Sequence, residues 1–134
     1  MVKIKNLCRL LLITLISVML LGCSVNEVIR VGTPFNDKRG EGVDFHTEVT
    51  DREAITKVRT IINSLEEIEE PHYLKDIPDA FISLDRLAES VSEIRRYIWY
   101  QDDGSAILNV DGGSKFYNMT KQQHNELKRI LEES

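Results

Sequence analysis

Cysteine is scarce in this chain of 134 residues, in which Cys8 and Cys23 are the two present. Cys8 lies inside an apolar leader that we expect to be removed, and Cys23 is the first residue after that leader. The mature chain therefore has neither a disulfide framework nor a thiol nucleophile. Its roughly 110 residues must be held by their own hydrophobic core, which is enough for a single domain.

Positive charge is also in short supply. The chain has 17 Lys and Arg against 22 Asp and Glu, and the leader takes three of the cations with it, so the net charge from residue 23 onward is −8. Binding a phosphate backbone requires a basic face, so nucleic acid is excluded as a partner. The same balance disfavours electrostatic adhesion to anionic lipid, and membrane attachment should rest on acyl chains instead.

Sequence signatures of catalysis are missing as well. The mature chain contains no Gly-x-Ser-x-Gly elbow and no Ser-x-x-Lys pair. Asp111-Gly112-Gly113 lacks the Lys-Ser/Thr and the helix of a phosphate-binding loop, and Asp102-Asp103-Gly104 is what a turn requires. We therefore expect no enzyme activity and no cofactor.

Metal-ligand spacing is absent too. His46, His72 and His124 are the histidines of the chain, and no two of them are paired at a ligand spacing. We expect His46 on the solvent side of a strand, His72 in a loop and His124 on the flank of a helix. No metal site is predicted.

The longest apolar run, from Leu10 to Leu21, is too short to cross a membrane, which takes roughly 20 apolar residues. It follows a basic start with Lys3, Lys5 and Arg9, which is the arrangement of a signal peptide. Gly22-Cys23 comes directly after the run. The pattern resembles a bacterial lipoprotein signal.

The predicted processing follows from that pattern. We expect residues 1–22 to be a signal peptide cleaved between Gly22 and Cys23, with a diacylglycerol on Cys23 whose acyl chains, such as palmitate, anchor the protein. Residues 23–27 form the lipidated start and a short tether, and residues 28–134 form one domain. The protein is then anchored at the extracytoplasmic face of the cell membrane. An uncleaved N-terminal anchor, or a secretory peptide cut elsewhere, is the alternative.

Strand patterns recur along the mature chain. Apolar residues predict strands near residues 28–35, 80–84, 91–101 and 106–110, and a short one near 115–118. Residues 43–49 alternate, with Val43, Phe45, Thr47 and Val49 expected on one face. The short turns after residues 101 and 110 require antiparallel neighbours.

Two helices are predicted from caps and periodicity. Thr50 with Glu53 has the spacing of a capping box, and Thr120 with Gln123 repeats it. Apolar stripes follow each cap, and the first helix should fray after about Leu65, where glutamates accumulate. The predicted fold is α+β, with an antiparallel sheet of about five to six strands and both helices on one face, in the order β-β-α-β-β-β-β-α.

A family resemblance runs through these same elements. Ile29-Arg30-Val31, Thr50-Asp51, Pro78-Asp79, Tyr97-Ile98-Trp99 and Phe116-Tyr117 occur in the succession of the YhfM-like domain of small Firmicutes lipoproteins. The domain resembles that family over nearly all of the mature chain. The resemblance implies the fold and the compartment, and it brings no catalytic residues.

The aromatic cluster Tyr97, Trp99 and Tyr100 is the candidate for partner binding. On a strand, Tyr97 and Trp99 share one face and Tyr100 lies on the other, so one set can pack while the other meets solvent. A core role is the competing interpretation, because Trp and Tyr fill cores more often than they bind partners.

From these features we expect a lipoprotein whose domain is a non-catalytic binding or regulatory module of the cell envelope, with an envelope protein as partner. A small-ligand-binding or enzyme-like domain, with a site that sequence spacing does not reveal, is the first alternative. A structural surface module is the second.

Overall fold

The structure is a computed structural model that describes residues 3–4, 6 and 26–134. Gly22 and Cys23 lie outside the described residues. In chain order the elements are β1 (Glu27–Asp37), β2 (Gly40–Val49), α2 (Arg52–Asn63), β3 (Glu66–Ile68), β4 (Ala80–Arg86), β5 (Val91–Tyr100), β6 (Ala106–Val110), β7 (Phe116–Met119) and α3 (Lys121–Glu133).

Within residues 26–134, seven strands form one antiparallel sheet in the order β2-β1-β4-β5-β6-β7-β3. The predicted α+β class is confirmed, although the sheet has one more strand than expected. The extra strand is β3, which pairs with β7 where fraying of the helix was predicted. Glu66 and Glu67 are exposed there, which suits a short edge strand because charge discourages further pairing.

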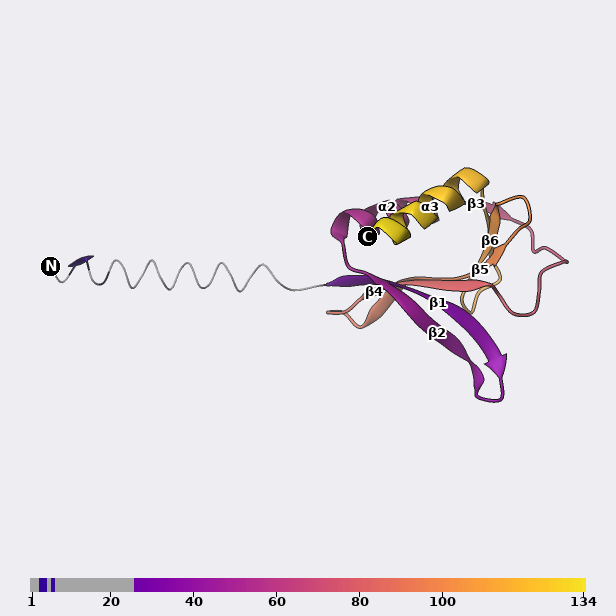
Figure 1. The fold of residues 1–134 in the computed structure, drawn as a ribbon, viewed down its shortest axis with the longest axis horizontal. Coiled ribbons are helices and arrows are strands. Elements are labelled where there is room, and N and C mark those ends of the chain that lie inside the picture. Colours follow the sequence, from indigo (N-terminus) through magenta and orange to yellow (C-terminus); the bar gives the residue numbers. More distant parts are fainter. Residues whose placement is uncertain (1–2, 5, 7–25) are drawn as a thin grey trace.

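Helices α2 and α3 contact each other and cover one face of the sheet (Figure 1). Their apolar stripes face inward-pointing residues of the central strands, where alternate side chains share a face. The main core lies between the two layers. Its largest fully buried members are Ile29, Val49, Val58, Ile82, Leu84, Leu108 and Met119.

The helix starts are capped by side chains. Thr120 accepts from the backbone N–H of Gln123, and the Gln123 side chain accepts from the backbone N–H of Thr120, so the predicted capping box of α3 is confirmed. The prediction for α2 was wrong by one residue. Asp51, rather than Thr50, caps α2 by accepting from the N–H of Ala54, because an Asp carboxylate is an equally good cap and the helix begins at Arg52.

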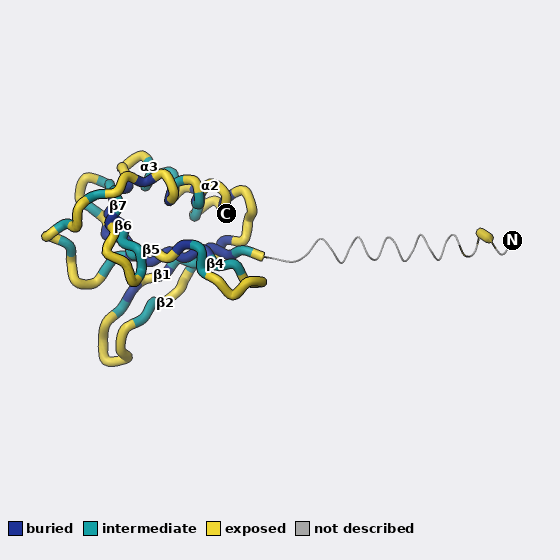
Figure 2. The backbone as a smooth tube through the Cα atoms, turned by 180° about the vertical axis from the view of Figure 1, so that it is seen from behind, coloured by how far each residue is buried: buried dark blue, intermediate teal, exposed yellow. Residues whose placement is uncertain are grey.

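The other sheet face carries a second cluster, in which Trp99, Ile107 and Phe116 are buried together. The segment between β3 and β4 covers this cluster, with Leu74 packed against it. The indole N–H of Trp99 donates to the carbonyl of Lys75 at 2.9 Å, which joins that segment to the sheet. The backbone trace in Figure 2 is buried along β4 and exposed at the tip of the β1–β2 hairpin.

Candidate functional site

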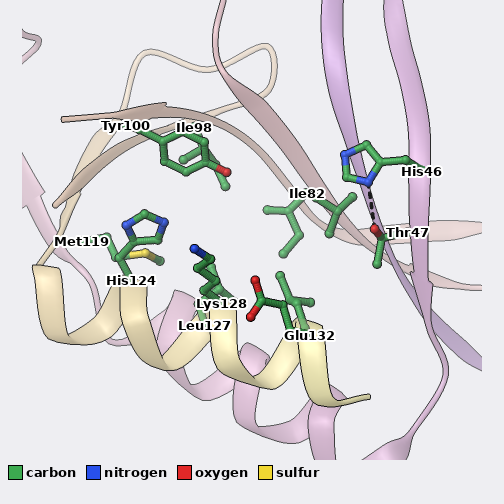
Figure 3. Close-up of a pocket in the computed structure, with 12 residues that line it drawn as sticks. His46, Thr47, Ile82, Ile98, Tyr100, Met119, His124, Leu127, Lys128 and Glu132 are labelled. Carbon is green, nitrogen blue, oxygen red and sulfur yellow. Dashed lines mark hydrogen bonds between the residues drawn. The ribbon is translucent and has the colours of Figure 1, made fainter. Parts of the chain in front are cut away.

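A groove of about 460 Å³ lies between α3 and the helix-covered face of the sheet (Figure 3). That volume is within the range of small-molecule sites. We call it the α3 groove. It is lined by Val31, His46, Thr47, Ile82, Ile98, Tyr100, Met119, His124, Leu127, Lys128, Leu131 and Glu132.

The floor of the α3 groove is apolar. Ile82, Ile98 and Met119 come from three strands of the sheet and are buried, and Leu127 of α3 is buried beside them. Leu131 follows Leu127 at a spacing of four, so both leucines lie on the same side of the helix. The floor therefore favours a hydrocarbon portion of a ligand.

Polar side chains from α3 stand along the rim. His124, Lys128 and Glu132 are spaced four residues apart, which places them in one row on the helix. Figure 3 shows this row rising from α3 beside the apolar floor. Arg129, by contrast, pairs with Glu126 and Glu133, which do not line the groove. The rim thus presents an imidazole, an ammonium and a carboxylate to one space.

His124 is held in a defined orientation. Its Nδ1 lies 2.9 Å from the carbonyl oxygen of Gly104, and a carbonyl oxygen can only accept, so Nδ1 carries the proton. In the neutral ring Nε2 is then the nitrogen with the free lone pair. His124 also stacks on Tyr100, with ring centroids 5.0 Å apart and planes 14° apart. The contact with Gly104 therefore fixes which nitrogen is available as a base, and the stacking on Tyr100 holds the plane of the ring.

Tyr100 remains a phenol through the neutral range. Burial, together with the negative charge of Asp79, raises the pKa of Tyr100 above its ordinary value. The backbone N–H of Tyr100 donates to the Asp79 carboxylate at 2.8 Å, which fixes the strand end. The Tyr100 hydroxyl is thus a hydrogen-bond donor at the mouth of the groove.

A β-bulge brings two neighbouring residues of β2 to the same groove. Val31 pairs with Thr47 and Gly32 pairs with Phe45, so the pairing skips His46. A bulge re-aims side chains, which explains why both His46 and Thr47 line the groove although successive residues of a regular strand face opposite sides. Gly32 permits this, because a Cβ there would lie 2.7 Å from the backbone oxygen of Asp44.

The bulge also corrects the predicted pattern of β2. Phe45 packs edge-on against Phe81 at 6.1 Å, on the face away from the helices, whereas Thr47 faces α3. The predicted common face of Phe45 and Thr47 was wrong, because strict alternation is lost at the extra residue. His46 is exposed as predicted, but its side chain turns toward the groove. Its Nδ1 forms a hydrogen bond with Thr47 Oγ1 at 2.8 Å.

The structure separates the three aromatic candidates. Trp99 is 8% exposed and belongs to the second cluster, and Tyr97 packs at the edge of that cluster and lies 5.0 Å from Phe81. Tyr100 is 47% exposed and faces the α3 groove. The faces of β5 alternate as predicted, but little of the Trp99 surface is left for a partner.

The other residues considered from the sequence lie in turns. Asp103 accepts from the backbone N–H and the hydroxyl of Ser105, and these bonds lower the pKa of its carboxyl. Asp111 accepts from Arg95 Nε at 2.7 Å beside the β6–β7 turn. His72 is exposed in the loop between β3 and β4. Among the described residues, no three His, Cys, Asp or Glu side chains are grouped as a metal site would require.

The α3 groove was not predicted from the sequence. Its members are scattered from Val31 to Glu132, and only the sheet order places β1, β5 and α3 around one space. The row of His124, Lys128 and Glu132 was the signal available, because a four-residue repeat of groups able to do chemistry lies beside the apolar stripe of a helix.

Comparison with known proteins supports the fold. No family model and no curated protein matches this chain. The crystal structure of a thioesterase-like protein from Clostridium sporogenes matches with a TM-score of 0.56 and 22% identity, over 78% of this chain and 92% of that one. At this identity the likeness establishes a shared fold.

These findings correct the functional expectation. The expectation of a non-catalytic binding or regulatory module of the envelope is contradicted, because a thioesterase-like protein shares the fold. The likeness fits the first alternative, a ligand-binding or enzyme-like domain, better than that expectation. The α3 groove is the candidate for a site that sequence spacing did not reveal. In the described part of the chain, no helix is long and apolar enough to span a membrane.

Proposed function

We propose that the domain binds an amphipathic small molecule in the α3 groove, with a hydrocarbon chain on the floor and an anionic or polar head at the rim. The observation that carries this proposal is the pairing of the apolar floor with the row of His124, Lys128 and Glu132. An apolar cavity with a few convergent polar groups is the usual form of a small-ligand site. Lys128 is the group suited to an anionic head, and Tyr100 can donate to it.

The binding test uses the fluorescent anion ANS and straight-chain fatty acids as competitors. We expect ANS fluorescence to rise on binding and the fatty acids to displace it, with affinity increasing with chain length until the groove is full. Lys128→Glu should weaken binding of the anionic probe by about tenfold or more, because it removes a charge-assisted hydrogen bond and places a carboxylate beside the anion.

Arg129→Glu is the matched control, because it makes the same charge change at the next residue, outside the groove. It should leave the affinity unchanged. Thr47→Phe tests the volume, since an added ring would fill the groove from β2. Equal effects of the two charge reversals, or no effect of Thr47→Phe, would place the ligand elsewhere.

A second candidate is hydrolysis of an acyl thioester held in the same groove. It is favoured by the orientation of His124, whose Nε2 carries the free lone pair when the ring is neutral. Nε2 would take a proton from water as the hydroxyl attacks the carbonyl carbon, and it would return that proton to the departing thiolate. The products are a carboxylic acid and a thiol. The shared fold with a thioesterase-like protein supports the choice of substrate class.

The test is release of thiol from short-chain acyl thioesters, followed with a thiol-specific dye. His124→Gln should reduce the rate by about a hundredfold or more, the usual range for a general base. His72→Gln is the control, because His72 is exposed in a loop outside the groove. No thiol release above background by the wild-type chain would leave binding as the function of the groove.

We further propose that Cys23 carries the lipid anchor and that the protein is a YhfM-like lipoprotein of the cell membrane. The support is the sequence, in which a basic start and the apolar run lead directly to Gly22-Cys23. Intact mass of the membrane-extracted protein should show a diacylated species that begins at Cys23 and is lost in Cys23→Ala. An unmodified or differently cleaved chain would overturn this assignment.

A further inference from the structure

We propose that the turn between β4 and β5 is a membrane-contacting element that inserts Leu87 and Val91 into the lipid interface. We call residues 87–91 the anchor-side turn. Leu87 is 46% exposed and Val91 is 52% exposed, so two large apolar side chains stand in solvent at one end of the sheet. The inference rests on the Cys23 anchor proposed above and is independent of the ligand of the groove.

The anchor-side turn is hydrogen-bonded to the segment where the chain enters the domain. The backbone N–H of Leu87 donates to the carbonyl of Asn26 at 2.8 Å, and Glu27 pairs with Arg86 across β1 and β4. Arg59 of α2 forms an ion pair with Glu27 and a second one with Glu93 of β5 at 2.7 Å. The point where the chain enters the domain is therefore fixed beside the turn.

Chain length then limits how far the turn can lie from the lipid. Asn26 is three residues after Cys23, and three residues span at most about 11 Å when fully extended. Acyl chains on Cys23 hold that residue at the bilayer surface. Because Asn26 contacts Leu87 directly, the anchor-side turn must lie close to the headgroups.

The charges at this end favour an apolar contact over an electrostatic one. Arg86, next to the turn, is engaged by Glu89 and Glu93, and these carboxylates raise the pKa of the guanidinium further. Its charge is therefore compensated within the protein. What remains for the membrane is the hydrocarbon of Leu87 and Val91, whose transfer out of water is favourable.

The opposite end of the sheet offers a comparison. Tyr73 is 73% exposed and Ile77 is 44% exposed in the loop before β4. β4 runs from Ala80, beside that loop, to Arg86, which pairs with Glu27. Figure 1 shows this loop at the far end of the sheet from the start of β1. Exposed apolar side chains alone therefore do not predict contact, and nearness to the anchor separates the two sites.

The experiment places a fluorescent probe on the lipidated protein in vesicles of phosphatidylethanolamine and phosphatidylglycerol that carry a spin-labelled quencher lipid. Leu87→Cys and Val91→Cys are labelled in separate samples, and Tyr73→Cys is the control. After processing, the introduced cysteine is the free thiol, because Cys8 leaves with the leader and Cys23 is acylated. We expect the probes at positions 87 and 91 to be quenched strongly and the probe at position 73 to keep its fluorescence.

Intact mass of each sample separates the possible failures. A diacylated protein whose probes at positions 87 and 73 are quenched equally, or not at all, would overturn the contact and leave the anchor standing. A chain without acyl groups would overturn both. Shielding of position 87 from a water-soluble quencher, without quenching by the labelled lipid, would show contact between two copies of the chain and would also contradict the proposal.

Discussion

Trp99 connects the sheet to the long segment between β3 and β4. Its ring packs against Ile107 and Phe116, and its indole N–H donates to the carbonyl of Lys75. Packing and a hydrogen bond to that segment thus come from one side chain. We therefore expect Trp99 to contribute to the free energy of unfolding.

We predict that Trp99→Ala lowers the free energy of unfolding by roughly 3–5 kcal/mol, the usual cost of removing a large aromatic from a core. Trp99→Phe should cost less, because most of the ring volume stays while the bond to Lys75 is lost. Urea denaturation followed by far-UV circular dichroism measures both, since Trp99 is the one tryptophan of the chain and fluorescence would be lost. A cost below about 1 kcal/mol for the alanine variant would contradict the core role.

Glu93 makes the fold sensitive to acid. Hydrogen bonds from Arg59, and then from Arg86, lower the pKa of Glu93 below its ordinary 4.5. Above that value the carboxylate is charged in the folded and unfolded chains, and its two ion pairs stabilise the fold. As the pH falls below it, the unfolded chain binds the proton first, so this stability is lost progressively.

We therefore predict that Glu93→Gln costs about 1 kcal/mol at neutral pH, as expected of a partly exposed ion pair, and that the difference from the wild type shrinks below about pH 4. Denaturant unfolding at a series of pH values measures this. Glu66→Gln is the control, because Glu66 lies exposed on the edge strand β3. A difference between Glu93→Gln and the wild type that is independent of pH would exclude the ion pairs as its cause.

In the β1–β2 hairpin, His46 can be removed without changing how the two strands pair. Because the ladder passes from Val31–Thr47 to Gly32–Phe45, removing His46 leaves every existing pair in register. We predict that deletion of His46 keeps the fold and a single cooperative unfolding transition, while binding in the α3 groove changes. Cross-strand contacts in nuclear magnetic resonance spectra check the register.

The matched control for this prediction is deletion of Glu48, which is paired with Arg30. Losing a paired residue moves every residue between it and the hairpin turn to the opposite face, so this variant should be strongly destabilised. Similar stability for the two deletions would show that the pairing does not depend on the bulge.

Local sequence patterns predicted most of the helices and strands of the fold. The strands and helices were found from period and caps, because these signals lie within a few residues of one another. Two features were missed for physical reasons. β3 is a strand because β7 offers it a free edge, and nothing in its own three residues requires that. The bulge at His46 depends on Gly32, a residue of the neighbouring strand.

The site was less predictable than the fold. Tyr100 was identified, but as one of an aromatic set, and His124 was placed on the flank of a helix without a partner. Their stacking, and the bond from His124 to Gly104, depend on how α3 returns over the end of β5. Distances of this kind follow from the assembled sheet.

For the whole molecule, a ligand bound in the α3 groove should raise the free energy of unfolding. The groove lies between a helix and the sheet, so an unfolded chain has no equivalent site. A ligand at a hundred times its dissociation constant should therefore add about 2.7 kcal/mol to the free energy of unfolding. Thermal unfolding against a panel of fatty acids and acyl thioesters measures this. No shift for Thr47→Phe would assign the effect to the groove, and an equal shift would assign it elsewhere.

The bulge in β2 has a consequence for how related chains can diverge. A residue that the ladder skips can be gained or lost through a single codon, and every pair on either side keeps its partner. Length variation at this point would therefore remodel the wall of the groove while the sheet stayed the same. A change of ligand preference at this position would therefore cost little folding stability. In an alignment of related chains, a one-residue gap beside Thr47 would indicate a different ligand bound by the same fold.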